Sequence, residues 1–122
     1  MRRRARAKAD WVAIGASLLC AVHCALLPVS ALAAGFLPLA LQSEAVHIAL
    51  AVIAIAACGA VIALHRTARR LRFLVPAIGG SILLLLGLAA ETIGISEQLP
   101  TLAGSLLLIL AHIWRVRAGA LS

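Results

Sequence analysis

The sequence predicts an all-α membrane protein, a bundle of four transmembrane helices with both termini in the cytoplasm. Three observations support this fold class. Hydrophobic residues make up 64% of the 122 residues and charged residues only 12%, a composition too apolar for a soluble domain of this size. Four apolar runs are each long enough to cross a bilayer. All 11 lysines and arginines lie in three short blocks at the ends of these runs or between them, as the basic residues in the cytoplasmic segments of membrane proteins do.

The first predicted span covers residues 11–34 and follows the basic segment MRRRARAKAD. This apolar run is longer than the core of a signal peptide and it contains His23, so we interpret it as a membrane span. Asp10 lies directly before the run, and we expect it to cap the amino terminus of the first helix.

Three candidate metal ligands, Cys20, His23 and Cys24, lie inside this first span. On a helix their side chains point within about 100° of one another. Thiolates bind soft cations such as mercury, copper(I) and zinc, and a histidine in lipid is costly unless it has a partner or a function. The alternative is that both cysteines pack as small hydrophobic residues.

The second predicted span covers residues 45–64. His47, Cys58 and His65 are separated by intervals of nearly whole helical turns, so they lie on one stripe. Each also has a simpler interpretation, because the two histidines stand at the ends of the run and Cys58 can serve as a small packing residue. A basic loop, HRTARRLR, follows.

The third predicted span covers residues 73–95. Gly79, Gly80 and Gly87 are expected to allow close contact with a neighbouring helix. Glu91 is the ionisable group of this span, and it faces either an interior site or the headgroup region.

The fourth predicted span covers residues 99–116. Thr101, Ser105 and His112 fall within about 40° on one face of this helix. We expect this polar face to point into the bundle.

Charge predicts the orientation of the four spans. The basic blocks lie at the amino terminus, in the loop after the second span and at the carboxyl end, whereas the other two turns carry Glu44 and Glu97. With four spans, the three basic blocks fall on one side of the membrane. The positive-inside rule places that side in the cytoplasm.

A count of helical rise from the outer boundary orders the candidate ligands by depth. Cys24 and Cys20 lie about 10 and 16 Å down, and His47 and Glu91 lie within about 6 Å of the edge. Cys58 and His112 each lie about 20 Å down. The accessory pathway predicted on this count begins at His47 and Glu91, passes Cys24, His23 and Cys20, and ends at Cys58 and His112.

The stretch LLCAVHCALLP, the three further apolar runs and the late LAHIWRVR resemble the MerC mercury-resistance family of bacterial inner-membrane proteins. The resemblance covers residues 11–117 and is sharpest at Cys20–Cys24. It implies a single four-helix membrane domain that takes up mercuric ions, with Cys20 and Cys24 carrying the ion. Fuller family members have a second cysteine pair nearer the carboxyl end, whereas this chain has only Cys58 outside the motif.

The function that follows is uptake of a soft metal cation by ligand exchange on Cys20 and Cys24, with His23 as a third ligand or proton acceptor. The resemblance favours mercuric ion, and copper(I) and zinc are the alternatives. We expect no permanently bound cofactor and no enzymatic activity.

Three other functions stay open. A membrane thiol oxidoreductase would usually carry Cys-x-x-Cys at a solvent-exposed helix end, whereas Cys20 and Cys24 have three residues between them and lie within the span. A haem bundle would need two histidines at one depth on different helices, for which His23 and His112 are the nearest candidates. A structural subunit would use the cysteines only for packing.

The partners expected are the lipid bilayer of the bacterial inner membrane and the metal ion. A periplasmic metal-binding protein, a cytosolic reductase and a second copy of the chain are further candidates. Nucleic acid is not an expected partner, because the charges sit in separate blocks and aromatic residues make up only 3% of the chain.

Overall fold

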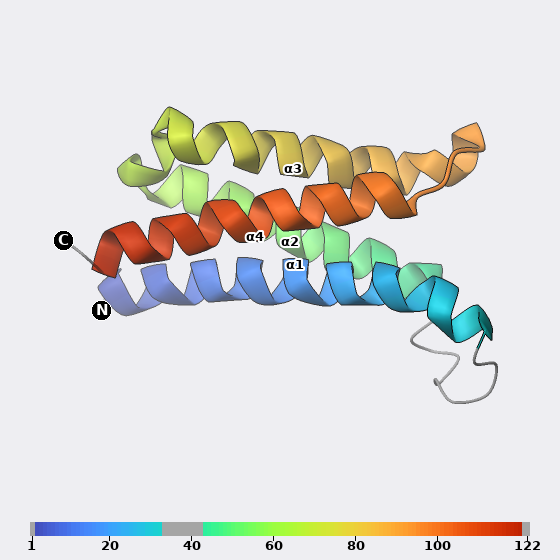
Figure 1. The fold of residues 1–122 in the computed structure, drawn as a ribbon. Helices are drawn as coiled ribbons and strands as arrows, with labels where there is room; N and C mark the ends of the chain where they lie inside the picture. Colours follow the sequence, from blue (N-terminus) through green and yellow to red (C-terminus); the bar gives the residue numbers. More distant parts are fainter. Residues whose placement is uncertain (1, 33–42, 121–122) are drawn as a thin grey trace.

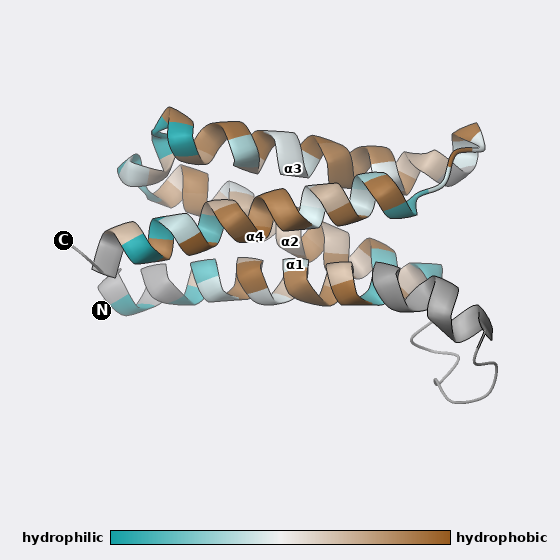
Figure 2. Cartoon of the chain, viewed as in Figure 1, coloured by the Kyte–Doolittle hydropathy of each residue, from teal (hydrophilic) through white to brown (hydrophobic). Residues whose placement is uncertain are grey.

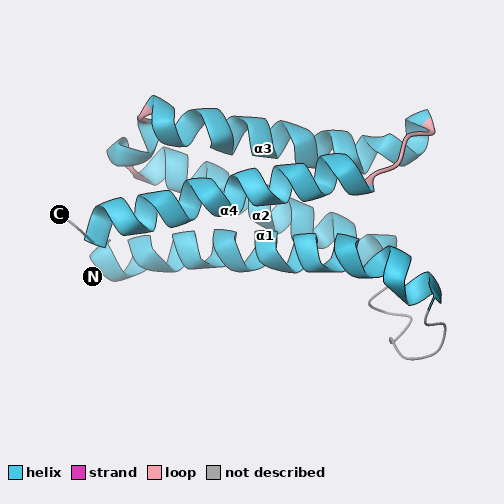
Figure 3. Ribbon diagram, viewed as in Figure 1, coloured by secondary structure: helices cyan, strands magenta, loops and turns pink. Residues whose placement is uncertain are grey.

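The computed structural model describes residues 2–32 and 43–120 and contains four long helices in this part of the chain. These are α1 (Arg2–Leu32), α2 (Glu44–Leu64), α3 (Leu71–Ala90) and α4 (Gln98–Ala120). Short 3-10 helices, η2 (Arg66–Arg69) and η3 (Glu91–Ile93), follow α2 and α3. The long helices run up and down along one axis, and short connections join α2 to α3 and α3 to α4 (Figures 1 and 3). The predicted all-α, four-helix fold is confirmed.

Both ends of the chain lie at the same end of the bundle as η2, and η3 lies at the opposite end (Figure 1). The three basic blocks therefore gather at one end, as the charge pattern predicts. Figure 2 shows the same division, with hydrophilic residues concentrated near the termini and η2, and hydrophobic residues along the middle of the helices. The turn at residues 33–42 lies outside the described residues.

Helix α1 begins at Arg2, so the prediction that Asp10 caps its amino terminus is wrong. Residues 2–9 contain only arginine, alanine and lysine, which all favour helix, and no proline or glycine interrupts them. The helix therefore continues through Asp10 and leaves its carboxylate free to contact another helix.

Local signals fix the other helix ends. Ser43 caps α2 by accepting a hydrogen bond from the backbone N–H of Val46 at 3.4 Å. After α3 and η3, Gly94 adopts a positive φ of 73°, and the N–H of Ile95 donates to the carbonyl of Ala90 at 2.9 Å. This is a glycine-dependent helix termination, so the regular helix ends at Ala90, before residue 95.

Helix α4 packs against both α1 and α3, and α1 also packs against α2, whereas α2 and α3 have few contacts with each other. Glycines bring α3 and α4 together. A Cβ atom on Gly80 would lie 2.8 Å from the carbonyl oxygen of Gly104, and one on Gly87 would collide with the Thr101 hydroxyl. Close contact at Gly80 and Gly87 is confirmed, while Gly79 makes only an ordinary contact with Leu107.

The bundle carries small and polar side chains inside and large apolar side chains outside. Thr101, Ser105 and His112 are fully buried, which confirms the predicted inward polar face of α4. Large hydrophobic residues such as Leu85 and Leu110 are more than half exposed. In the described residues, α2, α3 and the Gln98–Ala118 part of α4 are long and apolar enough to cross a membrane. This arrangement suits a lipid environment.

Candidate metal centre

Four side chains from three parts of the chain meet in the half of the bundle away from the termini. The His47 ring of α2 forms a side-chain hydrogen bond with Cys20 of α1. The rings of His23 and His47 are stacked, with centroids 6.0 Å apart and planes 28° apart. Nδ1 of His47 lies 3.4 Å from Oε2 of Glu97. We call Cys20, His23, His47 and Glu97 the outer cluster.

Helix geometry brings these residues together. Cys20 and His23 lie one turn apart on α1, which packs on α2. Glu97 lies directly before the first residue of α4, and its carbonyl accepts the N–H of Thr101 at 3.2 Å. Cys20 is fully buried and His47 is 2% exposed, so the thiol and the imidazole are held away from solvent.

The outer cluster has the chemistry of a metal-accepting thiol. A thiol becomes a metal ligand when it loses its proton. The imidazole beside Cys20 is a base that can take this proton, and the Glu97 carboxylate stabilises a protonated imidazole. His23 adds a second imidazole at the edge of the cluster. This arrangement supplies a soft donor, a proton acceptor and a compensating charge.

Cys24 follows Cys20 by one turn within α1, but its side chain lies outside the described residues. The same is true of Glu91, which begins η3. Among the side chains that are described, no three from His, Cys, Asp and Glu are placed to hold a metal ion together. The roles predicted for Cys24 and Glu91 stay predictions.

The structure joins the predicted outer mouth to the cysteine motif of the first span. The count of helical rise put His47 about 10 Å nearer the outer edge than Cys20, and in the structure the His47 side chain is hydrogen bonded to Cys20 and stacked on His23. His47 is therefore in contact with the motif rather than at a separate outer site.

The predicted stripe consists of His47 and Cys58 on α2 and His65 directly after it, and all three residues are buried. The Cys58 thiol forms a hydrogen bond with the hydroxyl of Ser81 on α3. That hydroxyl in turn donates to the carbonyl of Ala77 at 2.8 Å. Cys58 is therefore satisfied at the contact between α2 and α3.

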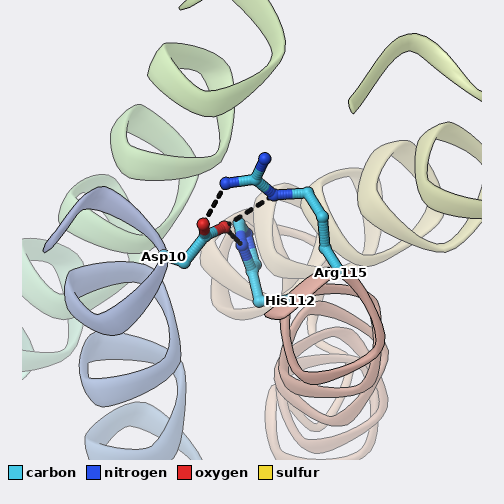
Figure 4. Close-up of polar contacts among 3 residues, drawn as sticks. All are labelled: Asp10, His112 and Arg115. Carbon is cyan, nitrogen blue, oxygen red and sulfur yellow. Dashed lines mark hydrogen bonds and ion pairs between the residues drawn. The ribbon is translucent and has the colours of Figure 1, made fainter. Parts of the chain in front are cut away.

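His112 belongs to a second polar cluster, near the end that carries the termini. Its Nδ1 lies 2.9 Å from Oδ1 of Asp10, and Nε of Arg115 donates to the same oxygen at 2.9 Å. A second nitrogen of Arg115 bonds Oδ2 of Asp10, as Figure 4 shows. The rings of Phe73 and His112 pack nearly at right angles, with centroids 5.1 Å apart. We call Asp10, His112 and Arg115 the inner cluster.

The predicted pathway ended at Cys58 and His112, and the structure gives these two residues different partners. The carboxylate of Asp10 can only accept, so Nδ1 of His112 donates to it. Within the described residues, Nε2 of His112 has no hydrogen-bond partner.

Sequence reasoning missed two members of these clusters. Glu97 entered only as an acidic residue of a turn, and Asp10 only as a helix cap. The sequence did contain a signal for Asp10, since it is the only acidic residue in a segment with five basic residues. A carboxylate there can pair with a basic group on another helix. For Glu97, the signal was its position directly before a helix that begins at the same end as His47.

A family model described as MerC mercury resistance protein matches residues 10–117. Comparisons with curated proteins and with solved structures find no match.

Proposed function

Because the chain belongs to the MerC mercury resistance protein family, we propose that it carries mercuric ion across the bacterial inner membrane on Cys20 and Cys24. Membership assigns the chain to mercury resistance and to the multi-pass membrane proteins that act as transporters. The ligands, the order of steps and the direction of flux are our proposal. The observation that carries it is the buried hydrogen bond between the Cys20 thiol and His47.

The first step is binding of mercuric ion to Cys20. One Hg–S bond forms, and the thiol proton passes to the imidazole of His47. Glu97, whose Oε2 lies 3.4 Å from Nδ1 of His47, offsets the new positive charge. Because the proton stays in the cluster, the net charge of the site still rises by the two charges of the ion, and the Glu97 carboxylate leaves the loaded site with one positive charge instead of two, which favours binding in a membrane interior.

The second step is an Hg–S bond to Cys24, whose thiol loses its proton to His23 or to water. Mercuric ion favours two thiolates in a nearly linear arrangement. Side chains one helical turn apart have Cβ atoms about 5–6 Å apart, which is compatible with that geometry after rotation about the side-chain bonds. His23 lies between the two cysteines in sequence and is half-buried beside His47. It serves as a transient third ligand or as a second proton acceptor.

A route toward the other end follows the contact between α1 and α4. Ser17 lies on α1 between Cys20 and Asp10, and Ser105 lies on the buried face of α4 with His112. Within the described residues, both hydroxyls are fully buried and have no hydrogen-bond partner. Burying such groups in an apolar interior raises the free energy of the folded protein. Their hydroxyls are suited to line a path for a polar or ionic species. The path leads to Nε2 of His112, which has no hydrogen-bond partner among the described residues.

The experiment is uptake of labelled mercuric ion by cells or vesicles that contain the protein at matched levels. Cys20→Ser and Cys24→Ser should each abolish uptake, because serine keeps the size of cysteine but lacks a soft, readily ionised donor. Cys58→Ser is the matched control and should retain uptake, since Cys58 already bonds Ser81. A stable Cys20→Ser protein that takes up mercury at the wild-type rate would contradict the proposal and indicate that Cys20 serves only in packing.

A further inference from the structure

An open groove with a volume of about 460 Å³ runs over α3 and α4 at the end of the bundle that carries the termini. Its walls come from the first turns of α3 and the last turns of α4. The apolar part includes Pro76 and Leu110, and the polar part includes Arg72, Trp114 and Arg117. The volume lies within the range of pockets that hold small molecules, roughly 300–1,000 Å³.

The arginines of this groove are available to an anion. The guanidinium carbon of Arg72 lies 5.9 Å from the centre of the Trp114 ring, a cation–π contact that holds the side chain at the groove without neutralising it. Arg115 is turned away and pairs with Asp10. In the described part of the chain, neither Arg72 nor Arg117 has a carboxylate partner.

The groove also lies where the headgroup region would meet the bundle. It is at the hydrophilic end of the bundle (Figure 2), next to helices whose large hydrophobic side chains are exposed, and Trp114 is a residue type enriched at membrane interfaces. Leu110 and Pro76 continue the groove toward the apolar middle of the helices. A ligand that fits is therefore anionic at one end and apolar at the other.

We propose that this groove is a specific binding site for an anionic phospholipid. The headgroup phosphate lies between Arg72 and Arg117, since guanidinium groups pair with phosphate oxygens through two parallel hydrogen bonds. The start of one acyl chain lies along Pro76 and Leu110. Basic pockets between transmembrane helices on the cytoplasmic side recognise anionic headgroups in this way. The inference requires only a membrane-spanning bundle and is independent of mercury.

The test is a lipid titration of the purified protein in detergent, without mercury, with phosphatidylglycerol and phosphatidylcholine as probes. Bound lipid is counted by native mass spectrometry. The wild type should bind one phosphatidylglycerol in preference to phosphatidylcholine. Each of Arg72→Gln and Arg117→Gln should weaken this binding about fivefold, the factor that one basic residue contributes near an anionic lipid surface.

The matched control is the double variant Arg66→Gln/Arg69→Gln in η2. It removes two exposed arginines at the same end of the bundle, outside the groove, and should bind phosphatidylglycerol as the wild type does. Equal weakening in the control would mean attraction by overall charge and would overturn the site. So would unchanged binding in Arg72→Gln/Arg117→Gln, or equal binding of the two lipids by the wild type.

Discussion

His47 connects three segments of the chain that are far apart in sequence. It is hydrogen bonded to Cys20, stacked on His23 and within 3.4 Å of Glu97. In the proposed mechanism, this position makes His47 the acceptor of the thiol proton. In this proposal the cysteines provide the affinity for mercury, and His47 speeds the loss of the thiol proton that makes Cys20 a ligand.

Replacing His47 should therefore slow uptake without removing the ligands. We expect His47→Gln to reduce the initial rate at low mercury concentration by roughly tenfold or more, because positioned bases typically contribute factors of about 10²–10⁴ to proton transfer. The measurement is initial uptake of labelled mercury at several concentrations. An unchanged rate at normal protein level would contradict the assigned role.

Glu97 acts on His47, so its replacement should have a smaller effect. Its side chain is 22% exposed, and partly exposed ion pairs contribute at most about 1 kcal/mol. Glu97→Gln should slow uptake by no more than about fivefold, and it should have no further effect in a His47→Gln background. Additive losses in the double variant would show that Glu97 acts on something other than His47. Glu91→Gln, made in parallel, tests the acid that the sequence placed at the outer edge.

Asp10 has two partners on α4, His112 and Arg115. Asp10→Asn leaves the Arg115 guanidinium without its carboxylate in a mostly buried place, since the Arg115 side chain is 13% exposed. The expected loss in the free energy of unfolding approaches the roughly 3–5 kcal/mol typical of a broken buried pair. Unfolding of the detergent-solubilised protein measures it.

A second variant separates this loss from a general effect of altering α1. Asp10→Asn/Arg115→Met removes both charges, so it should recover part of the stability lost in Asp10→Asn. If Asp10→Asn/Arg115→Met is less stable than Asp10→Asn by as much as Arg115→Met alone lowers the stability of the wild type, the two residues are not coupled.

Helices α3 and α4 are held together by backbone approach at Gly80 and Gly104. A methyl group at Gly80 would lie 2.8 Å from the Gly104 carbonyl oxygen, so Gly80→Ala must push the helices apart. We expect a loss of about 1–3 kcal/mol in the free energy of unfolding, the usual cost of overpacking.

Gly59 provides the matched control for this substitution. It lies in the interior of α2 with nothing within 4 Å of an added Cβ, and alanine favours helix over glycine by up to about 1 kcal/mol. Gly59→Ala should leave stability unchanged or raise it. Equal destabilisation by the two substitutions would mean that helix contact is not what Gly80 provides.

Much at the level of the helices followed from sequence. Long apolar runs predicted the number of helices, and the spacing of Thr101, Ser105 and His112 predicted which face of α4 is buried. The sequence did not predict the start of α1. The residues before Asp10 favour helix, but they have no periodic apolar pattern that would reveal a helix. The end of α3 was placed too late, since hydrophobicity continues past the turn that Gly94 allows.

The site was less predictable than the helices. Its motif, Cys20 to Cys24, is local and can be found in the sequence, but the partners of that motif depend on the offset between neighbouring helices. A count of residues within each helix does not determine that offset, so it could not predict the contacts of His47 with Cys20 and His23. Asp10 and Glu97 act across helices, and no spacing within one helix reveals such contacts.

At the scale of the whole molecule, both termini and η2 share one end of the bundle (Figure 1). The positive-inside rule predicts that this end is cytoplasmic. Reporter fusions at residues 5, 66–70 and 120 should therefore report a cytoplasmic location, and fusions at residues 43 and 97 an external one. A fusion at residue 120 that is active only outside would reverse the direction of the proposed route.

The central claim is that mercuric ion is bound by the thiolates of Cys20 and Cys24. X-ray absorption at the mercury edge tests it in the purified protein loaded with one equivalent of mercuric ion. In a Cys58→Ser background, only these two cysteines remain, and the account predicts two sulfur neighbours around mercury. Adding Cys20→Ser should leave one sulfur, with the other place taken by nitrogen or oxygen. A mercury environment that is the same with and without Cys20 would contradict the account.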